Sequence, residues 1–521
     1  MTDVATNSIT ETTERQQARA ADPEASAWVS ANAGTGKTYV LVQRILRLLL
    51  SGTPPQRILC LTFTKAAASE MSNRLFRRLS EWTIYNDQEA NEHIGKILGR
   101  PPSQVECDRA RRMFADALET PGGLKVQTIH AFCERLLHRF PLEAEIAPNF
   151  AVLDEAQESA LRRQIIEQIL KRASENDKSD LGHALKTITF FADEDRFISL
   201  IDSLLSKRII FQEHFRKLEN SNFGREELLQ DIKQKLGISH SFDLPTLRDR
   251  LSRIVSLDDI KFAAGVLATG QKSDQNLARK FEELMNTPDP EARVAVIQKI
   301  FLTDKKQPRK RLVTNRIKEE NETLVESLLR MQESVFDLIQ EIDKLRLAQA
   351  STALIVVSKE ISSAYRKIKL QRSALDFDDL IEKTSDLLSS SYASSWVLYK
   401  LDGGIDHILV DEAQDTNPIA WNIIDKLTDE FFSGESQSKD ARTIFAVGDE
   451  KQSIYGFQGA DPKKFAGMGE TFKKKAEMAL LDLHNIPLNQ SFRSTYPVLH
   501  SVDTVFQDQR LLKAVTSHSE T

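Results

Sequence analysis

One short segment, ANAGTGKT at Ala31–Thr38, constrains the fold of this chain more than any other. It follows the apolar run Ala27–Ala31, which is typical of a buried strand, and it precedes Tyr39–Leu50, which has the apolar stripe of a helix. A glycine-rich turn ending in Lys-Thr at such a junction matches the phosphate-binding loop GxxxxGK[ST], with Ala31 in place of the first glycine. An ordinary glycine-rich turn is the alternative, and the strand–turn–helix order argues against it.

The residue types of this loop suit phosphate binding. Gly34 and Gly36 allow backbone amides to face phosphate oxygens without a Cβ in the way, and the following helix directs its positive N-terminal end there. We expect the Lys37 ammonium to reach the β- and γ-phosphates and the Thr38 hydroxyl to bind Mg²⁺. The predicted cofactors are therefore ATP and Mg²⁺. The remaining loop residues expected to bind the nucleotide are Ala31, Asn32, Ala33 and Thr35.

Two adjacent carboxylates complete this predicted chemistry. Asp411 and Glu412 directly follow the apolar run His407–Val410. At the end of a strand, Asp411 is expected to hold Mg²⁺ through water, and Glu412 to orient and deprotonate the attacking water. An isolated Asp-Glu pair is more often a solvated helix start, but a phosphate loop in the same chain favours the catalytic interpretation. Far more chain separates Lys37 from Asp411 than a bare nucleotide-binding core needs, which predicts a large insertion.

Strand and helix patterns alternate at both ends of the sequence. This alternation predicts an α/β fold with a parallel sheet covered by helices on both faces. The helix Lys65–Trp82 is part of the pattern. The expected strands are Ala27–Ala31, Ile58–Phe63, Lys125–Ile129, His407–Val410 and Thr443–Val447.

The middle of the chain is predicted to be helical. Only five of the 20 glycines lie between Leu124 and Asp402. The clearest helix, Leu324–Leu345, has apolar residues at alternating steps of four and three. Packing into a core of the same chain is favoured over a coiled-coil partner helix.

Composition excludes several classes of protein. Three widely spaced cysteines exclude a disulfide framework and a CxxC metal site, and they indicate a reducing compartment, here the cytoplasm. No apolar run approaches the ~18 residues of a membrane span, and the N-terminus lacks a signal-peptide pattern. The net charge of −6 does not indicate a nucleic-acid partner. The segment Lys305–Lys318, however, has seven basic residues and no acid, so a solvated loop and a phosphate-binding loop are equally supported.

The ordered motifs resemble those of the UvrD/Rep-type superfamily 1 DNA helicases. The wording is most like that of AddA, the helicase–nuclease subunit of double-strand break repair, and the resemblance spans about residues 16–500. It implies a RecA-like fold for the P-loop sheet. The segments that carry the resemblance are Gln17 with Ala20, ANAGTGKT, Leu61–Met71, Val126–Phe132, Asp376–Leu380, Ile408–Thr416, Val447–Pro462 and Leu488–Ser494.

The resemblance implies further roles at the ATP site. By position, Gln17 would read the adenine edge, and Phe492, where the family usually has Tyr, would stack on adenine. Gln452 would sense the γ-phosphate and couple it to DNA. Arg493 would neutralise charge on the γ-phosphate, as arginines do in phosphoryl transfer. With Lys37, Asp411 and Glu412, these residues form the expected catalytic set.

Five positions match family residues that contact single-stranded DNA. Aromatic faces stack on any base, which suits a motor that moves along arbitrary sequence. Core packing is the alternative for each aromatic residue, and the motif context favours DNA contact. The five are Phe63, Thr64, His130, Tyr455 and Phe457.

The resemblance also implies a domain plan. Residues 1–15 are expected to be a disordered lead, 16–140 and 396–484 the two parts of a RecA-like ATP-binding lobe, 141–395 an all-helical insertion, and 485–521 the start of a second motor lobe that is essentially missing. The expected function is that of an ATP-dependent 3′–5′ DNA helicase or translocase in recombinational repair of double-strand breaks. As this chain alone, it is expected to be incomplete and to hydrolyse ATP poorly. The alternative is a non-catalytic remnant that binds nucleotide and single-stranded DNA, or one piece of a split gene. The expected partners are DNA and an AddB-like subunit, with no membrane.

Overall fold

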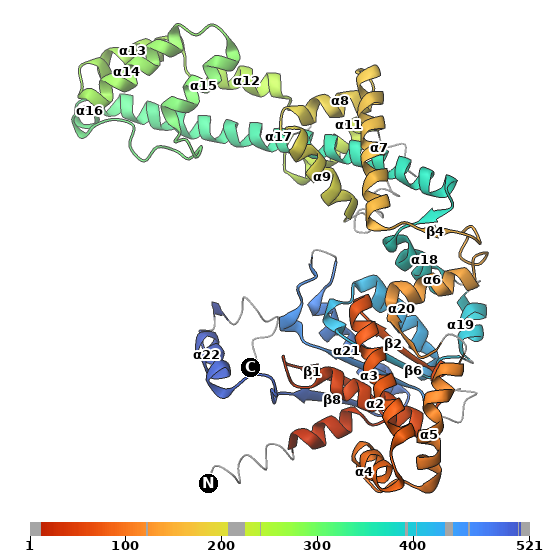
Figure 1. The fold of residues 1–521 in the computed structure, drawn as a ribbon. Coiled ribbons are helices and arrows are strands. Elements are labelled where there is room, and N and C mark those ends of the chain that lie inside the picture. Colours follow the sequence, from red (N-terminus) through yellow and green to blue (C-terminus); the bar gives the residue numbers. More distant parts are fainter. Residues whose placement is uncertain are drawn as a thin grey trace. The chain divides into compact units, whose positions relative to one another are not determined.

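The chain forms two compact units, which we call the sheet unit and the helical unit. The sheet unit combines residues up to Glu158 with those from Lys369 onward, and the helical unit is Ser159–Ile368. The structure is a computed structural model (Figure 1). It describes residues 12–120, 123–206, 224–239, 241–390, 394–402, 404–432, 441–456, 459–508 and 510–511.

The sheet unit is built on six parallel strands (Figure 1). Five of them confirm the predicted strands, with ends that differ by at most one residue, and the α/β fold class is confirmed with them. Strands from both ends of the sequence interleave, because Leu409 pairs with Cys60 and Ala446 with Trp28. The strands run in the order β3-β2-β6-β7-β1-β8, with bounds β1 (Ser26–Ala31), β2 (Ile58–Thr62), β3 (Lys125–Thr128), β6 (His407–Val410), β7 (Thr443–Gly448) and β8 (Leu483–Leu488).

Strand β8 forms one edge of this sheet. It pairs with β1 along its whole length, from Ser26–Leu483 to Ala31–Leu488. The expected domain boundary between residues 484 and 485 therefore falls inside a strand of the first lobe. The helix α22 (Tyr496–Phe506) follows β8.

Helices cover both faces of the sheet and form two separate hydrophobic cores. Because side chains alternate along a strand, Val29 enters one core and Trp28 the other. The first core contains residues of α2 (Lys37–Ser51), α3 (Lys65–Ile84), α4 (Asp87–Leu98) and α5 (Gln104–Glu119). The second contains residues of α6 (Ile129–Arg139), α18 (Phe377–Ser389), α19 (Ser394–Asp402), α20 (Pro418–Thr428) and α21 (Pro462–Met478). A two-stranded parallel sheet of β4 (Ala151–Val152) and β5 (Ala374–Leu375) also belongs to this unit.

The helical unit contains the predicted helix Leu324–Leu345 within a longer one. Helix α17 (Glu322–Gln371) has 50 residues, and its segment contains no glycine or proline that would end it earlier. Leu324, Leu328 and Val335 are buried in the core of the same unit, so the predicted packing within the chain is confirmed. The other helices here are α7 (Glu155–Glu175), which begins just before the unit boundary, α8 (Asp180–Thr189), α9 (Glu194–Ser206), α11 (Arg225–Lys235), α12 (Leu244–Arg253), α13 (Leu257–Ala268), α14 (Lys272–Met285), α15 (Pro290–Phe301) and α16 (Asn315–Glu320).

The N-terminal lead is helical where the structure describes it. Residues 12–20 form a helix, which begins inside the segment expected to be disordered, and residues 1–11 lie outside the described part. Across the described ranges, no helix combines the length and apolarity needed to cross a bilayer.

Candidate nucleotide-binding site

The phosphate loop lies at the edge of the sheet where all six strands have their carboxyl ends. Strand β1 ends at Ala31, and helix α2 begins at Lys37. Between them, Gly34 and Gly36 have φ angles of 77° and 91°, a left-handed conformation that favours glycine. Gly36 is the N-cap of α2 and has no side chain to bond the first-turn amides. Those amides, together with the helix dipole, can therefore bind an anion.

Residues distant in sequence pack against this loop. The Phe492 amide donates to the Gly34 carbonyl at 2.8 Å, and the Gln17 side-chain amide donates to the Thr35 carbonyl at 3.3 Å. A Cβ on Gly34 would lie 2.6 Å from Cβ of Arg493, so only glycine allows this approach. The structure thus places Gln17, Phe492 and Arg493 beside the loop, with the Phe492 ring 62% exposed.

Lys37 is held between the ends of two other strands. Its Nζ lies 3.2 Å from Glu412 Oε2, beyond β6, and 3.5 Å from Gln452 Oε1, beyond β7. Thr38 follows it in the first turn of α2. Three of the expected catalytic residues therefore converge on one point, although more than one strand and several hundred residues separate them in sequence.

Asp411 has the properties of a magnesium ligand. Its side chain is buried, and among the described residues its Oδ1 has no hydrogen-bond partner. Burial raises the pKa of Asp411 to about 6, and the adjacent Glu412 carboxylate adds to this rise. A buried carboxylate oxygen without a donor is costly unless a cation satisfies it, so the residues fit Mg²⁺ held by Asp411 and Thr38.

Glu412 adopts a strained backbone conformation. Its φ of 47° lies in the left-handed region, which non-glycine residues seldom adopt and which is concentrated at functional sites. Its carboxylate accepts from Lys37 and also from the side-chain amide of Gln414 at 2.8 Å.

Sequence reasoning missed two residues of this site, Gln414 and Asp449. Asp449 follows β7 directly, just as Asp411 follows β6, so the rule that functional groups gather at strand carboxyl ends could have identified it. Gln414 stands within the motif around Asp411 and Glu412, but no local pattern indicates that its side chain points inward.

The residues expected to contact DNA form two aromatic pairs. The rings of Phe63, after β2, and Tyr455, after β7, lie 4.3 Å apart at the carboxyl edge of the sheet, and both are partly exposed. The His130 ring meets the edge of Phe377 at 5.5 Å, and burial lowers the pKa of His130, with Lys65 contributing. The Thr64 hydroxyl caps α3 by accepting from the Ala67 amide. Phe457 lies outside the described residues.

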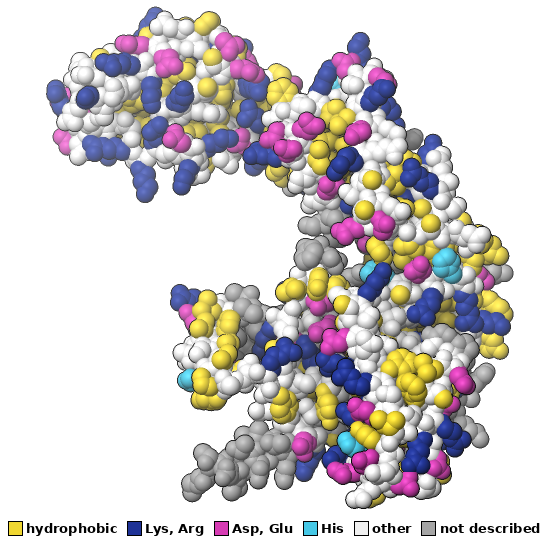
Figure 2. All heavy atoms as spheres, in the orientation of Figure 1, with side chains coloured by type: hydrophobic (Ala, Val, Ile, Leu, Met, Phe, Trp, Pro, Cys, Tyr) yellow, Lys and Arg dark blue, Asp and Glu magenta, His cyan; other side chains and the backbone are white. Residues whose placement is uncertain are grey.

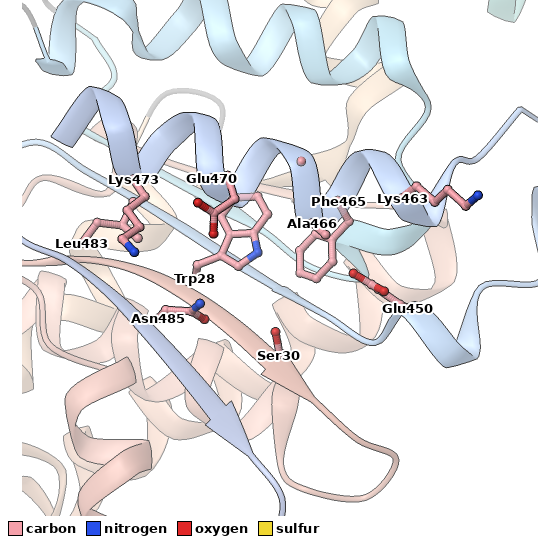
Figure 3. Close-up of a pocket in the computed structure, with 12 residues that line it drawn as sticks. Trp28, Ser30, Glu450, Lys463, Phe465, Ala466, Glu470, Lys473, Leu483 and Asn485 are labelled. Carbon is pink, nitrogen blue, oxygen red and sulfur yellow. The ribbon is translucent and has the colours of Figure 1, made fainter. Parts of the chain in front are cut away.

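A cavity of about 610 Å³ lies between helix α21 and strands β1 and β8 (Figure 3). Trp28 stacks on Phe465 at its wall, with 4.8 Å between ring centroids. Because Trp28 and Ser30 point to the face opposite Val29, this cavity is distinct from the phosphate loop. Glu450, which borders it, belongs to the same short turn as Gln452.

The basic run Lys305–Lys318 is exposed but partly paired within the helical unit. Lys306 forms an ion pair with Asp343 at 2.6 Å, and Arg316 forms one with Glu320 at 3.0 Å. Burial lowers the pKa of Lys280, and the nearby guanidinium of Arg309 adds to this shift, as positive charges gathered at one place do. Lys and Arg side chains are frequent on the face of this unit in Figure 2.

The fold and the site together define a class. A parallel sheet with a glycine-rich loop and lysine after one strand, and carboxylates after neighbouring strands, is the architecture of the P-loop nucleotide-binding proteins. All the groups described above occupy the edge of the sheet where such proteins bind phosphates.

The chain belongs to the UvrD/REP helicase family. The model of the UvrD/REP helicase N-terminal domain matches residues 12–243 and 233–473, which together include most of the chain. Curated relatives that are named as a subunit of an ATP-dependent helicase/nuclease are similar along nearly the whole of it. The protein from Lactobacillus gasseri is 25% identical over 92% of this chain and 38% of its own length. The protein from Lactiplantibacillus plantarum is 27% identical over 95% of this chain and 39% of its own length. The chain thus spans about two fifths of the length of these relatives.

Proposed function

We propose that this chain is the ATP-binding part of a DNA helicase or translocase that hydrolyses ATP to move along single-stranded DNA. One observation carries the proposal. The groups for nucleotide hydrolysis and an exposed aromatic pair lie at the same edge of one sheet, joined by the short segment from Gln452 to Tyr455. A change at the nucleotide can therefore reach a base-stacking residue over three residues of chain.

The nucleotide chemistry follows from the side chains. Lys37 and the amides of the phosphate loop bind the phosphates, while Asp411 and Thr38 hold Mg²⁺, which supplies charge neutralisation when it is bound. The phosphates compete with Glu412 for the Lys37 ammonium, and Glu412 is then available to accept a proton from the attacking water. Arg493 lies beside Gly34 and is placed to neutralise charge on the γ-phosphate.

The DNA side of the proposal rests on stacking. Phe63 and Tyr455 present partly exposed rings, and His130 and Phe377 form a second pair. Stacking does not depend on base identity, in keeping with movement along any sequence. Phosphate contacts from the basic run Lys305–Lys318 would add salt-dependent affinity.

The biological setting is proposed from the relatives. Their names, which describe one subunit of a helicase/nuclease, suggest 3′–5′ movement, action on DNA ends in double-strand break repair, and an AddB-like partner. DNA substrates with single-stranded tails of each polarity test the direction of movement.

Single-stranded DNA should stimulate phosphate release by the purified chain. We expect stimulation of at least about tenfold in the wild type and none in Lys37→Ala, which lacks the phosphate-binding ammonium. Nucleotide and DNA binding without hydrolysis above the Lys37→Ala level would instead support the non-catalytic alternative.

A further inference from the structure

Gln414 is a buried polar side chain whose two ends are both fixed. Its Nε2 donates to Glu412 Oε2 at 2.8 Å and to Asp415 Oδ2 at 3.3 Å, and its Oε1 accepts from the Asp449 amide at 2.9 Å. The side chain is 1% exposed. Its partners determine which end of the amide is oxygen, because carboxylates only accept and a backbone N–H only donates.

These bonds close a ring around the candidate site. Lys37 donates to Glu412 and to Gln452, and Gln452 donates to the Asp449 carboxylate. The Asp449 amide donates to Gln414, which returns to Glu412. Gln414 is therefore the side chain that joins the end of β6, with the expected general base, to the end of β7, with the expected γ-phosphate sensor.

The neighbouring strand leaves space for Gln414. A Cβ on Gly448 would lie 2.7 Å from Gln414 Oε1 and 3.1 Å from the Gln414 amide nitrogen. Gly448 does not have a positive φ, so the close approach of Gln414, and not backbone conformation, accounts for glycine at this position.

Gln414 matters most when the nucleotide is bound. Among the described residues, the donors to the Glu412 carboxylate are the side chains of Lys37 and Gln414. Lys37 is the group for which phosphates compete, and the Glu412 side chain is 38% exposed. Once Lys37 turns to the phosphates, Gln414 is the donor that still fixes the direction of this carboxylate.

We propose that Gln414 is a positioning residue for hydrolysis. It holds the Glu412 carboxylate where it accepts the proton of the attacking water, and it ties that carboxylate to the turn that carries Gln452. This inference rests on the proposed function, since it assigns a role within the same hydrolytic site.

The variant Gln414→Met tests the proposal, because methionine keeps the volume and removes the hydrogen bonds. Its matched control is Gln332→Met in the helical unit, where a glutamine that is 6% exposed donates to the carbonyls of Phe301 and Arg309. We expect Gln414→Met to lower kcat by roughly 10–100-fold, as small misplacements of catalytic groups do, with KM within about threefold. Gln332→Met should stay within about twofold of the wild type in both. Gly448→Ala keeps the amide but displaces it, and should lower kcat in the same way even where Gln414→Met folds poorly.

Two results would overturn the proposal. One is a kcat of Gln414→Met and Gly448→Ala within about twofold of the wild type, and the other is a loss that matches the control or falls mainly on KM. If the wild type releases no phosphate above Lys37→Ala, the proposed function fails, and a double-mutant cycle of Glu412→Gln and Gln414→Met on nucleotide-free unfolding decides the positioning. Coupling of at least about threefold in the unfolding constant supports it, and additivity refutes it.

Discussion

The buried carboxylate of Asp411 makes a quantitative prediction about stability. Burial raises its pKa from 3.8 to about 6, with Glu412 adding to the shift. Between these values the folded state binds more protons than the unfolded state, so stability falls as pH rises through this window. At neutral pH the group is ionised in both states, and a shift of about two pKa units corresponds to a loss of about 3 kcal/mol.

The variant Asp411→Asn removes this penalty. In Mg²⁺-free buffer we expect it to raise the free energy of unfolding of the sheet unit by about 1–3 kcal/mol at neutral pH, and by about half as much at about pH 5. Urea unfolding followed by tryptophan fluorescence measures this unit specifically, because Trp28, Trp82, Trp396 and Trp421 all belong to it.

Asp406→Asn is the matched control for this experiment. Asp406 is also buried, but its carboxylate lies 3.0 Å from Arg57 and 3.5 Å from Arg442, so removing its charge should destabilise the protein. A gain for Asp411→Asn that is equal at both pH values, or a loss at neutral pH, would refute the reasoning about burial.

Three other predictions test the site and its surroundings. Glu412→Gln should keep nucleotide binding and lower phosphate release by at least about 100-fold, the usual contribution of a general base; unchanged release would remove Glu412 from that role. Phe63→Ala and Tyr455→Ala should each weaken single-stranded DNA binding by about 1–3 kcal/mol in fluorescence anisotropy, and the double variant should lose less than the sum, because the rings touch. Burial, with the charge of Arg44 adding, lowers the pKa of His407 to about 3, so its contribution to stability is present above 6.5 and is lost as pH falls toward 3. His407→Asn should therefore lose about 1 kcal/mol less than the wild type between about pH 6.5 and pH 5.5 in urea unfolding, and equal losses would contradict this.

The sequence was sufficient to predict the elements of the fold but not how they pair. Local patterns predicted β1 and α2, because a glycine-rich loop can only join elements of fitting period. The neighbours of each strand depend on contacts between distant parts of the chain, so the edge position of β8 beside β1 could not be predicted. The stripe in Leu324–Leu345 predicted the core-facing side of a helix, but it did not predict that α17 continues to Gln371.

The candidate site divides in the same way. Lys37 and Asp411 could be predicted because each follows a strand within a motif of strong chemical meaning. The role of Gln414 depends on the turn after β6 and on the space above Gly448, which no spacing in the sequence reveals. Arg493 was expected at the ATP site from resemblance alone, and the approach of its backbone to Gly34 places it beside the loop.

The most direct test of the account is equilibrium binding of a fluorescent ATP analogue to the whole chain. Because Lys37 and Asp411 are assigned to one site for phosphates and Mg²⁺, binding should saturate, should depend on Mg²⁺, and should weaken by at least about tenfold in Lys37→Ala. Binding that is equally tight in Lys37→Ala and independent of Mg²⁺ would contradict the claim that these residues form one nucleotide site.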